Sequence, residues 1–250
     1  MRWEPKPIPN DEVIKLLQSQ IGVSRHVSIL LAQRGINNYS MAKLFFRPQL
    51  NHFHDPFLMK DMKFATDRIN QAIRNNENIL IYGDYDVDGV ASTALLTTFL
   101  RQKATKIFPY IPDRATEGYG ISINGINEAI KKGVTLIISI DCGIKAIEEV
   151  EYAKCNDIDF IICDHHLPES ELPDAIAVLD PKRNDCEYPF KELCGCGIGF
   201  KLIQALCIEW GIDVQELTKY LDLVSLATAA DQVPLSEENR IITHLGLRQI

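Results

Sequence analysis

The stretch Ile79-Leu80-Ile81-Tyr82-Gly83-Asp84-Tyr85-Asp86-Val87-Asp88-Gly89 joins a short apolar run to a loop that carries three acidic residues. The apolar part is too continuous for a strand with one face in water. The loop leads into residues 90–101, which have the spacing of a helix. This stretch therefore predicts a buried parallel strand whose carboxyl end is lined with carboxylates.

Four similar apolar runs follow, and helical stretches of about ten residues separate most of them. The runs cover residues 106–110, 135–140, 160–163 and 176–179, and the helical stretches cover 124–132 and 145–154. Such alternation predicts an α/β fold with a doubly wound, mostly parallel sheet. Residues 1–75 have helical patterns, as does the C-terminal portion after Cys194. We therefore expect a helical N-terminal region over residues 1–75 and an α/β domain over residues 76–250.

The composition limits the class of protein. The 250 residues carry a formal net charge of -8, from 34 acidic and 26 basic side chains. This balance provides no basic surface for nucleic acid, so nucleic-acid binding would have to rely on local charge and on metal. The seven cysteines include no C-x-x-C pair, and no apolar run is long enough for a membrane span or secretory signal. We expect a cytoplasmic protein with reduced thiols and no membrane contact.

Acidic residues and histidines follow two more of the predicted strands. Asp141 follows the run 135–140, and the triplet Asp164-His165-His166 follows the run 160–163. A further acid, Asp231, ends the apolar helical stretch 221–230. The carboxyl ends of parallel strands share one edge of the sheet, so these groups should lie close together and need a cation to balance their repulsion.

Aspartate and histidine without cysteine favour Mn²⁺ or Mg²⁺ over structural zinc. Such a set of ligands resembles a two-metal site, which stabilises both the attacking and the leaving oxygen in phosphoryl displacement. Taken singly, Asp141 or Asp164 could instead cap a helix. The loop from Asp84 could resemble a calcium loop, but Leu95 stands where that loop requires glutamate. The coincidence of three acidic strand ends favours hydrolysis of a phosphoester by a metal centre.

These motifs resemble the DHH phosphoesterase superfamily, which is named for the triplet at Asp164, His165 and His166. Within it, the chain resembles the branch of single-strand-specific 5'→3' exonucleases. The other matching segments are residues 54–58, 82–89, 112–120, 141–143, 188–189, 195–197, 229–235 and 238–240. The resemblance implies that residues 76–250 form the catalytic domain. The C-terminal lobe and the oligonucleotide-binding domain of that branch would lie beyond Ile250, in a longer protein.

The resemblance also implies roles for individual residues. Two Mn²⁺ or Mg²⁺ ions would be held by Asp86, Asp88, Asp141, His165 and Asp231. Asp141 would bridge the ions and act in catalysis, with Asp84 and Asp164 as supporting residues behind the ligands. His166 would contact the scissile phosphate or act as the acid, although it could instead bond a ligand carboxylate. Arg114 would bind phosphate, although it could instead form a salt bridge within its loop.

The implied activity is hydrolysis of single-stranded DNA in repair and recombination, with a single-strand-binding protein and a helicase as partners. Two other functions are compatible with the motifs. The first is a phosphodiesterase for short oligonucleotides or cyclic dinucleotides; its pyrophosphatase-like relatives place histidine where this chain has Tyr82. The second is a catalytically silent scaffold, but every expected ligand is present here. Gln232, Cys194 and Cys196 depart from the family pattern, and none of them belongs to the expected ligand set.

Overall fold

The computed structural model describes residues 4–250, which form two compact units, one up to His52 and the other over Phe53–Ile250. The first unit contains three short helices and a 3-10 turn, whose bounds are α1 Asp11–Ile21, α2 Arg25–Ala32, α3 Tyr39–Phe46 and η1 Leu50–His52. Asn10 caps α1, since its side chain accepts a hydrogen bond from the amide of Glu12. Leu17, Leu31 and Ala42 form the small core of this unit.

The boundary between the units lies at His52 and Phe53, earlier than the expected boundary after residue 75. The difference arises from α4 (Met62–Arg74), which packs against α8 and β5 of the second unit. Its buried residues Met62, Ala65 and Ile69 form part of the core of that unit. The helical pattern of this segment was predicted correctly, but its packing partners lie more than 100 residues away along the chain.

The second unit is built on a five-stranded parallel sheet, which confirms the predicted fold class. The strands are β1 Asn78–Tyr82, β2 Ile107–Tyr110, β3 Val134–Ile140, β4 Asp159–Cys163 and β5 Ala177–Leu179. They are ordered β2-β1-β3-β4-β5. From β1 the chain continues to β2 on one side of the sheet, and from β3 it continues to β4 and β5 on the other side, so the strand order reverses between β1 and β3. Ligands in such sheets bind where the order reverses, outside the carboxyl ends of the two central strands.

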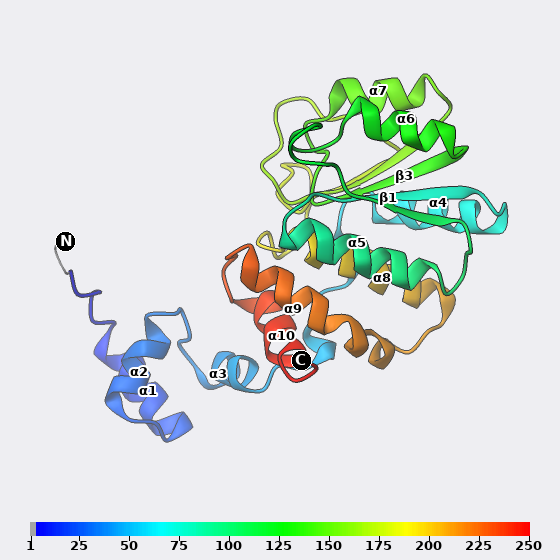
Figure 1. Ribbon diagram of the computed structural model, residues 1–250. Helices are drawn as coiled ribbons and strands as arrows, with labels where there is room; N and C mark the ends of the chain where they lie inside the picture. The colour runs from blue at the N-terminus through cyan, green and yellow to red at the C-terminus, as the bar shows by residue number, and fades with distance from the viewer. Residues whose placement is uncertain (1–3) are drawn as a thin grey trace. The chain divides into compact units, whose positions relative to one another are not determined.

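Helices cover both faces of the sheet (Figure 1). One face is covered by α6 (Ile123–Lys131) and α7 (Ile147–Lys154), and the other by α4, α5 (Val87–Leu100) and α8 (Gly195–Trp210). Because both faces are covered, the central strands are buried along almost their whole length. This burial explains the continuous apolar runs of the sequence.

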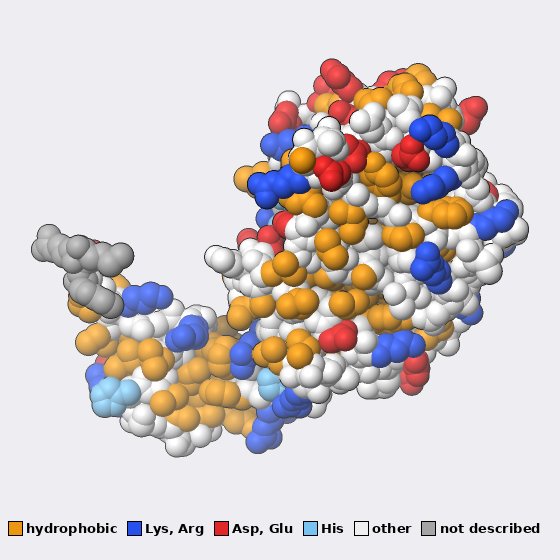
Figure 2. Space-filling model, in the orientation of Figure 1, with side chains coloured by type: hydrophobic (Ala, Val, Ile, Leu, Met, Phe, Trp, Pro, Cys, Tyr) orange, Lys and Arg blue, Asp and Glu red, His pale blue; other side chains and the backbone are white. Residues whose placement is uncertain are grey.

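A further layer consists of η3 (Val214–Tyr220), α9 (Leu221–Ala230) and α10 (Glu237–Gly246), and the 3-10 turn η2 spans Pro56–Leu58. Within the C-terminal portion that the sequence predicts to be helical, residues 214–230 are thus divided into a 3-10 and an α segment. Since α5 packs against the sheet, α8 and α9, it is apolar on almost every side. Figure 2 shows hydrophobic side chains gathered over α5 and α9. No helix in the described part of the chain is long and apolar enough to cross a membrane.

A buried ion pair joins α8 to α10. The Lys201 ammonium is fully buried and lies 3.1 Å from the Glu238 carboxylate, and it also donates to the backbone oxygen of His54 at 2.7 Å. The other carboxylate oxygen of Glu238 accepts from the hydroxyl of Tyr188 at 2.6 Å. Burial lowers the pKa of Lys201, and the Glu238 carboxylate opposes that effect. Each of these two buried charges is therefore stabilised by the other.

Replacing Glu238 with alanine should lower the free energy of unfolding by about 3–5 kcal/mol, because the Lys201 ammonium would remain buried without its carboxylate. Chemical denaturation followed by circular dichroism measures this change. Glu187→Ala is the matched control, since Glu187 is exposed, and it should change stability by less than about 0.5 kcal/mol. Equal effects of the two substitutions would show that the ion pair does not stabilise the unit.

Candidate metal centre

Backbone hydrogen bonds align the ends of the central strands. The amide of Asp141 donates to the carbonyl of Cys163 at 2.9 Å, and the amide of Asp164 donates to the carbonyl of Leu179 at 3.0 Å. The first residues after β3 and β4 therefore extend the strand ladder by one step. Asp141 thus lies beside the end of β1, at the point where the strand order reverses.

The loop after β1 folds tightly back on itself. Asp86 is the N-cap of α5, and its side chain accepts from the amide of Gly89 at 3.0 Å. A Cβ atom on Gly89 would lie 2.4 Å from the carbonyl oxygen of Asp84, so only glycine fits there. This turn buries Asp84 and leaves Asp86 exposed.

Asp88 lies against the N-terminus of α8. Its two carboxylate oxygens accept hydrogen bonds from the amides of Gly195 at 2.6 Å and Cys196 at 2.8 Å. Burial raises the pKa of Asp88, and these two amides oppose the rise. A Cβ atom on Gly195 would lie 2.8 Å from the Cα atom of Asp141. The glycine therefore allows the helix to approach both carboxylates at once.

Asp141 has a left-handed backbone, with a φ of 64°. This conformation is uncommon for residues other than glycine, although aspartate and asparagine tolerate it better than most. Burial, followed by the negative charges of Asp88 and Asp86, raises the pKa of Asp141 far above its usual range. One of its carboxylate oxygens, Oδ1, is buried and makes no hydrogen bond with any described residue.

His165 lies between the carboxylates. Its Nε2 atom is 3.2 Å from Asp141 and 4.0 Å from Asp88, and its Nδ1 atom is 3.8 Å from Asp231. Burial lowers the pKa of His165, so the ring is neutral and offers a lone pair. Its buried Nδ1 atom, like Asp141 Oδ1, has no hydrogen-bond partner among the described residues.

Three overlapping groups of side chains bring their ligand atoms within 4.8 Å of one another. They are Asp84, Asp86 and Asp141; Asp88, His165 and Asp231; and Asp141, His165 and His166. Asp84 Oδ1 is also buried without a hydrogen-bond partner in the described structure. Buried carboxylate oxygens that accept no hydrogen bond, together with a neutral imidazole, suit Mn²⁺ or Mg²⁺. The structure therefore brings together all five expected ligands, and Asp84 joins them.

Asp164 is turned toward the protein backbone. Its carboxylate accepts from the amide of Ile144 at 2.9 Å and makes a 2.7 Å contact with Nδ1 of His166. Burial opposes ionisation of Asp164, but the hydrogen bond and positive charge of His166 outweigh it and hold its pKa below the usual value. The same hydrogen bond raises the pKa of His166. Asp164 therefore orients the His166 ring and leaves Nε2 on its outer side.

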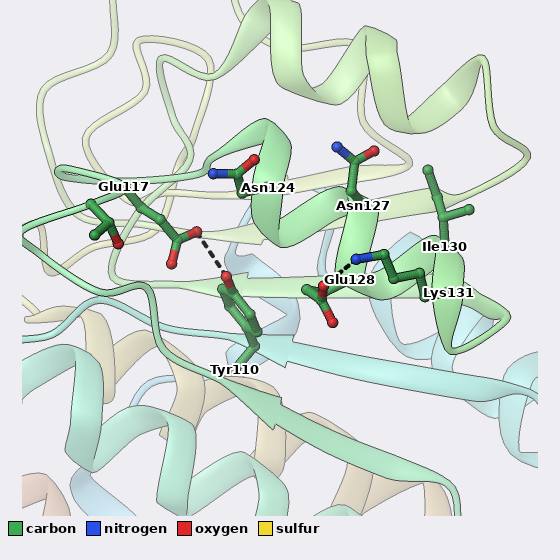
Figure 3. A pocket seen from close by; sticks show the side chains of 8 residues that line it. Tyr110, Glu117, Asn124, Asn127, Glu128, Ile130 and Lys131 are labelled. Carbon is green, nitrogen blue, oxygen red and sulfur yellow. Dashed lines mark hydrogen bonds and ion pairs between the residues drawn. The ribbon is translucent and has the colours of Figure 1, made fainter.

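The loop between β2 and α6 borders the site. It brings the hydroxyl of Tyr119 to 3.3 Å from Nε2 of His166, and it places the guanidinium of Arg114 over the ring of Tyr85, 5.1 Å from its centre. Glu117 anchors this loop, since it accepts from the hydroxyl of Tyr110 at 2.7 Å (Figure 3). Arg114 itself is exposed and makes no ion pair in the described structure, so the alternative of a salt bridge within the loop does not apply.

One acid at this edge was not predicted from the sequence. Asp180 directly follows β5 and is fully buried; it accepts from the amide of Lys182 at 2.7 Å. Burial raises the pKa of Asp180 to about 7. The rule that identified Asp141 and Asp164 applies equally to this strand end and could have found it. Lys182, two residues further on, has no comparable sequence signal.

Comparison with known proteins places these observations in a family. Residues 78–228 match the model of the DHH family, N-terminal domain. The chain is 44% identical over 250 residues to the single-stranded-DNA-specific exonuclease RecJ of Bacillus subtilis, and it covers 31% of that protein. It is 36% identical over 251 residues to RecJ of Haemophilus influenzae and covers 43% of it. The chain thus spans less than half the length of these relatives.

Solved structures show the same fold. A crystal structure of exonuclease RecJ bound to manganese matches with a TM-score of 0.70 and 32% identity, over 77% of this chain and 48% of that one. RecJ from Thermus thermophilus in complex with Mn²⁺ matches with a TM-score of 0.80 and 25% identity, over 96% of this chain and 34% of that one. Since the matching segment 78–228 makes up more than half of the sequence and contains the whole sheet, the chain belongs to the DHH family.

Proposed function

We propose that this chain is the N-terminal catalytic portion of a metal-dependent 5'→3' exonuclease that hydrolyses single-stranded DNA in repair and recombination. The observation that carries the proposal is the group of buried, unpaired ligand atoms from Asp84, Asp141 and His165 at the switch point of the sheet. The substrate follows from the relatives, which are named single-stranded-DNA-specific exonucleases. The catalytic domain proposed over residues 76–250 would also include the segment from Phe53 with α4, and the helical unit up to His52 would precede it.

In this proposal, Asp84, Asp86, Asp88, Asp141, His165 and Asp231 hold two Mn²⁺ or Mg²⁺ ions. When bound, such ions activate water and polarise the phosphodiester. The protein contributes a rigid geometry, because strand ends and helix termini position the carboxylates. It also keeps His165 neutral through burial, so that the imidazole can act as a ligand.

His166 and Arg114 would act on the substrate. Asp164 orients His166 and favours its protonated form, which suits a group that contacts a phosphate or donates a proton to the leaving oxygen. Arg114 presents an unpaired guanidinium at the edge of the site, and its planar shape suits phosphate oxygens. A complete set of ligands supports an enzyme over a silent scaffold.

The chain covers only part of its relatives, so several statements about the whole protein belong to the proposal. We propose single-stranded DNA as the substrate, with a single-strand-binding protein and a helicase as partners and the cytoplasm as the location. A positively charged path for the strand would come from the parts of the longer relatives that this chain does not cover. This arrangement would reconcile DNA binding with the net charge of -8.

Asp141→Asn should abolish metal binding while preserving the fold. Asparagine tolerates the left-handed backbone, whereas Asp141→Ala would add strain. Wild-type protein should gain about 2.7 kcal/mol of stability when free Mn²⁺ reaches about 100 times its dissociation constant, and the variant should gain almost none. Thermal unfolding with and without Mn²⁺ measures this difference. An unchanged gain in the variant would exclude Asp141 as a ligand.

The neighbouring histidines should separate metal binding from catalysis. His165→Gln should weaken Mn²⁺ binding by at least about tenfold, because it removes a ligand. His166→Gln should bind Mn²⁺ within about threefold of wild type, while kcat falls by about 10²- to 10⁴-fold. Calorimetric titration and steady-state kinetics provide the two measurements. If His166→Gln loses Mn²⁺ binding as severely as His165→Gln does, His166 is itself a ligand.

The direction of digestion is testable with end-labelled DNA. The chain should release labelled mononucleotides from the 5' end of a single strand in Mn²⁺, and excess chelator should stop the release. A duplex of the same sequence with blunt ends is the control and should be cut far more slowly. Products released only from the 3' end would contradict the proposal, as would activity that persists in chelator.

A further inference from the structure

The acidic residues are unevenly distributed along the chain. Residues 13–54 contain no aspartate or glutamate, although the whole chain has 34 acidic residues. The basic residues of this stretch are Lys15, Arg25, Arg34, Lys43 and Arg47. Nearly all of the stretch lies in the first unit, which ends at His52. The net charge of -8 therefore conceals a basic N-terminal unit, and a local excess of Lys and Arg attracts polyanions.

Two of these basic residues have no partner within the described structure. Lys15 and Arg25 both pair with Asp11, at 3.0 and 2.7 Å. Lys43 and Arg47 are exposed, and neither side chain makes an ion pair or hydrogen bond with any residue that the structure describes. An ammonium and a guanidinium of this kind can each bind an anion without first breaking an ion pair.

The helix α3 places aromatic rings on the same face as Lys43. The opposite side of the helix packs into the core of the first unit through Ala42 and Phe45. Tyr39, Lys43 and Phe46 have the i, i+4 and i+7 spacing of a single helix face, and all three are exposed. Tyr39 and Phe46 expose 50% and 46% of their surfaces. The helix therefore presents two aromatic rings to solvent, with a cation between them along the helix.

We call Tyr39, Lys43, Phe46 and Arg47 the α3 face. Its two rings are separated by about 10 Å along the helix axis, which is too far for them to stack on each other. The Phe46 ring makes an edge contact with Phe45, at 5.2 Å between the ring centres. Arg47 directly follows α3 and adds its charge at the C-terminal end of the face. Each ring can therefore stack with a separate planar group.

This combination suits a single-stranded nucleic acid better than an acidic polypeptide. Single strands bind where bases stack on exposed aromatic rings and cations contact the phosphates. An acidic polypeptide would need the cations but not the two exposed rings. Figure 2 shows hydrophobic side chains gathered on the visible face of the first unit, with Lys and Arg side chains around them. The chemistry of the α3 face therefore favours a strand of nucleotides.

We propose that the α3 face is a second contact for single-stranded DNA, with bases against its two rings and phosphates on Lys43 and Arg47. The inference rests on the proposed function, which identifies the nucleic acid. It adds a surface in the first unit, whereas the candidate metal ligands all belong to the second. Stacking and phosphate contacts do not depend on the identity of the base. The α3 face therefore holds the strand without selecting its sequence.

Binding of a fluorescent oligothymidine in excess chelator tests the cations of this face without hydrolysis of the strand. Each phosphate contact to a single strand contributes about 0.7 to the slope of log affinity against log salt concentration. The double variant Lys43→Gln/Arg47→Gln should therefore reduce the magnitude of this slope by about 1.4. Fluorescence anisotropy over a series of salt concentrations measures it. Lys15→Gln is the control and should keep the wild-type slope, since Lys15 lies in the same unit but is paired with Asp11.

The aromatic rings are tested with separate variants. Tyr39→Ala and Phe46→Ala should each weaken binding by about fivefold or more, because each removes a stacking partner. Neither should change the salt slope, since no charge is lost. Leu30→Ala is the control and should bind as the wild type does, because Leu30 is 51% exposed in the same unit but is not aromatic. Circular dichroism verifies that each variant is folded.

Absence of binding by the wild type in chelator would overturn the proposal, as would a wild-type salt slope in the double variant. A third result would also overturn it. If the aromatic variants bind normally and polyglutamate of equal charge competes as well as unlabelled oligothymidine does, the surface binds an acidic polypeptide instead.

Hydrolysis of single-stranded DNA by the wild type in Mn²⁺ distinguishes these failures from a failure of the proposed function. If the wild type degrades DNA but the variants of the α3 face bind as the wild type does, only the role of this face is wrong. If these variants lose binding and the wild type does not degrade DNA, the proposed function is wrong and the α3 face remains a surface for single strands.

Discussion

The two hydrogen bonds from the N-terminus of α8 to Asp88 are the contact on which the candidate site depends. The N-terminus of a helix carries partial positive charge and unpaired amides, so it stabilises a buried carboxylate that would otherwise resist ionisation. The same contact presses Gly195 against Asp141 and thereby joins the loop after β1, the end of β3 and the start of α8. A side chain at Gly195 would separate these three elements.

The cluster of carboxylates around Asp141 lowers the stability of the fold. Asp141 combines a left-handed backbone with a carboxylate surrounded by other negative charges, and both features cost free energy in a protein without bound cations. The surrounding structure compensates through a fully covered sheet and through buried pairs such as Lys201 and Glu238. Repulsion among carboxylates at one edge of a stable scaffold is typical of a functional site.

The three neighbouring residues of the triplet Asp164-His165-His166 make different contacts. Asp164 faces inward and holds the backbone and His166, His165 faces the carboxylates, and His166 faces the loop between β2 and α6. A single strand end therefore contributes a support, a candidate ligand and a candidate substrate contact.

The sequence by itself determined the α/β class, the five strands and the edge at which the acids gather. These features follow from local apolar periodicity and from the rule that parallel strands end at one edge. Only the tertiary structure decided that α4 belongs to the sheet unit, that Asp84 joins the ligand atoms while Asp164 turns away, and that Asp180 and Lys182 border the site. Each of these three findings depends on packing between segments distant in the chain or on the direction of a side chain. Neither long-range packing nor side-chain direction produces a periodic pattern in the sequence.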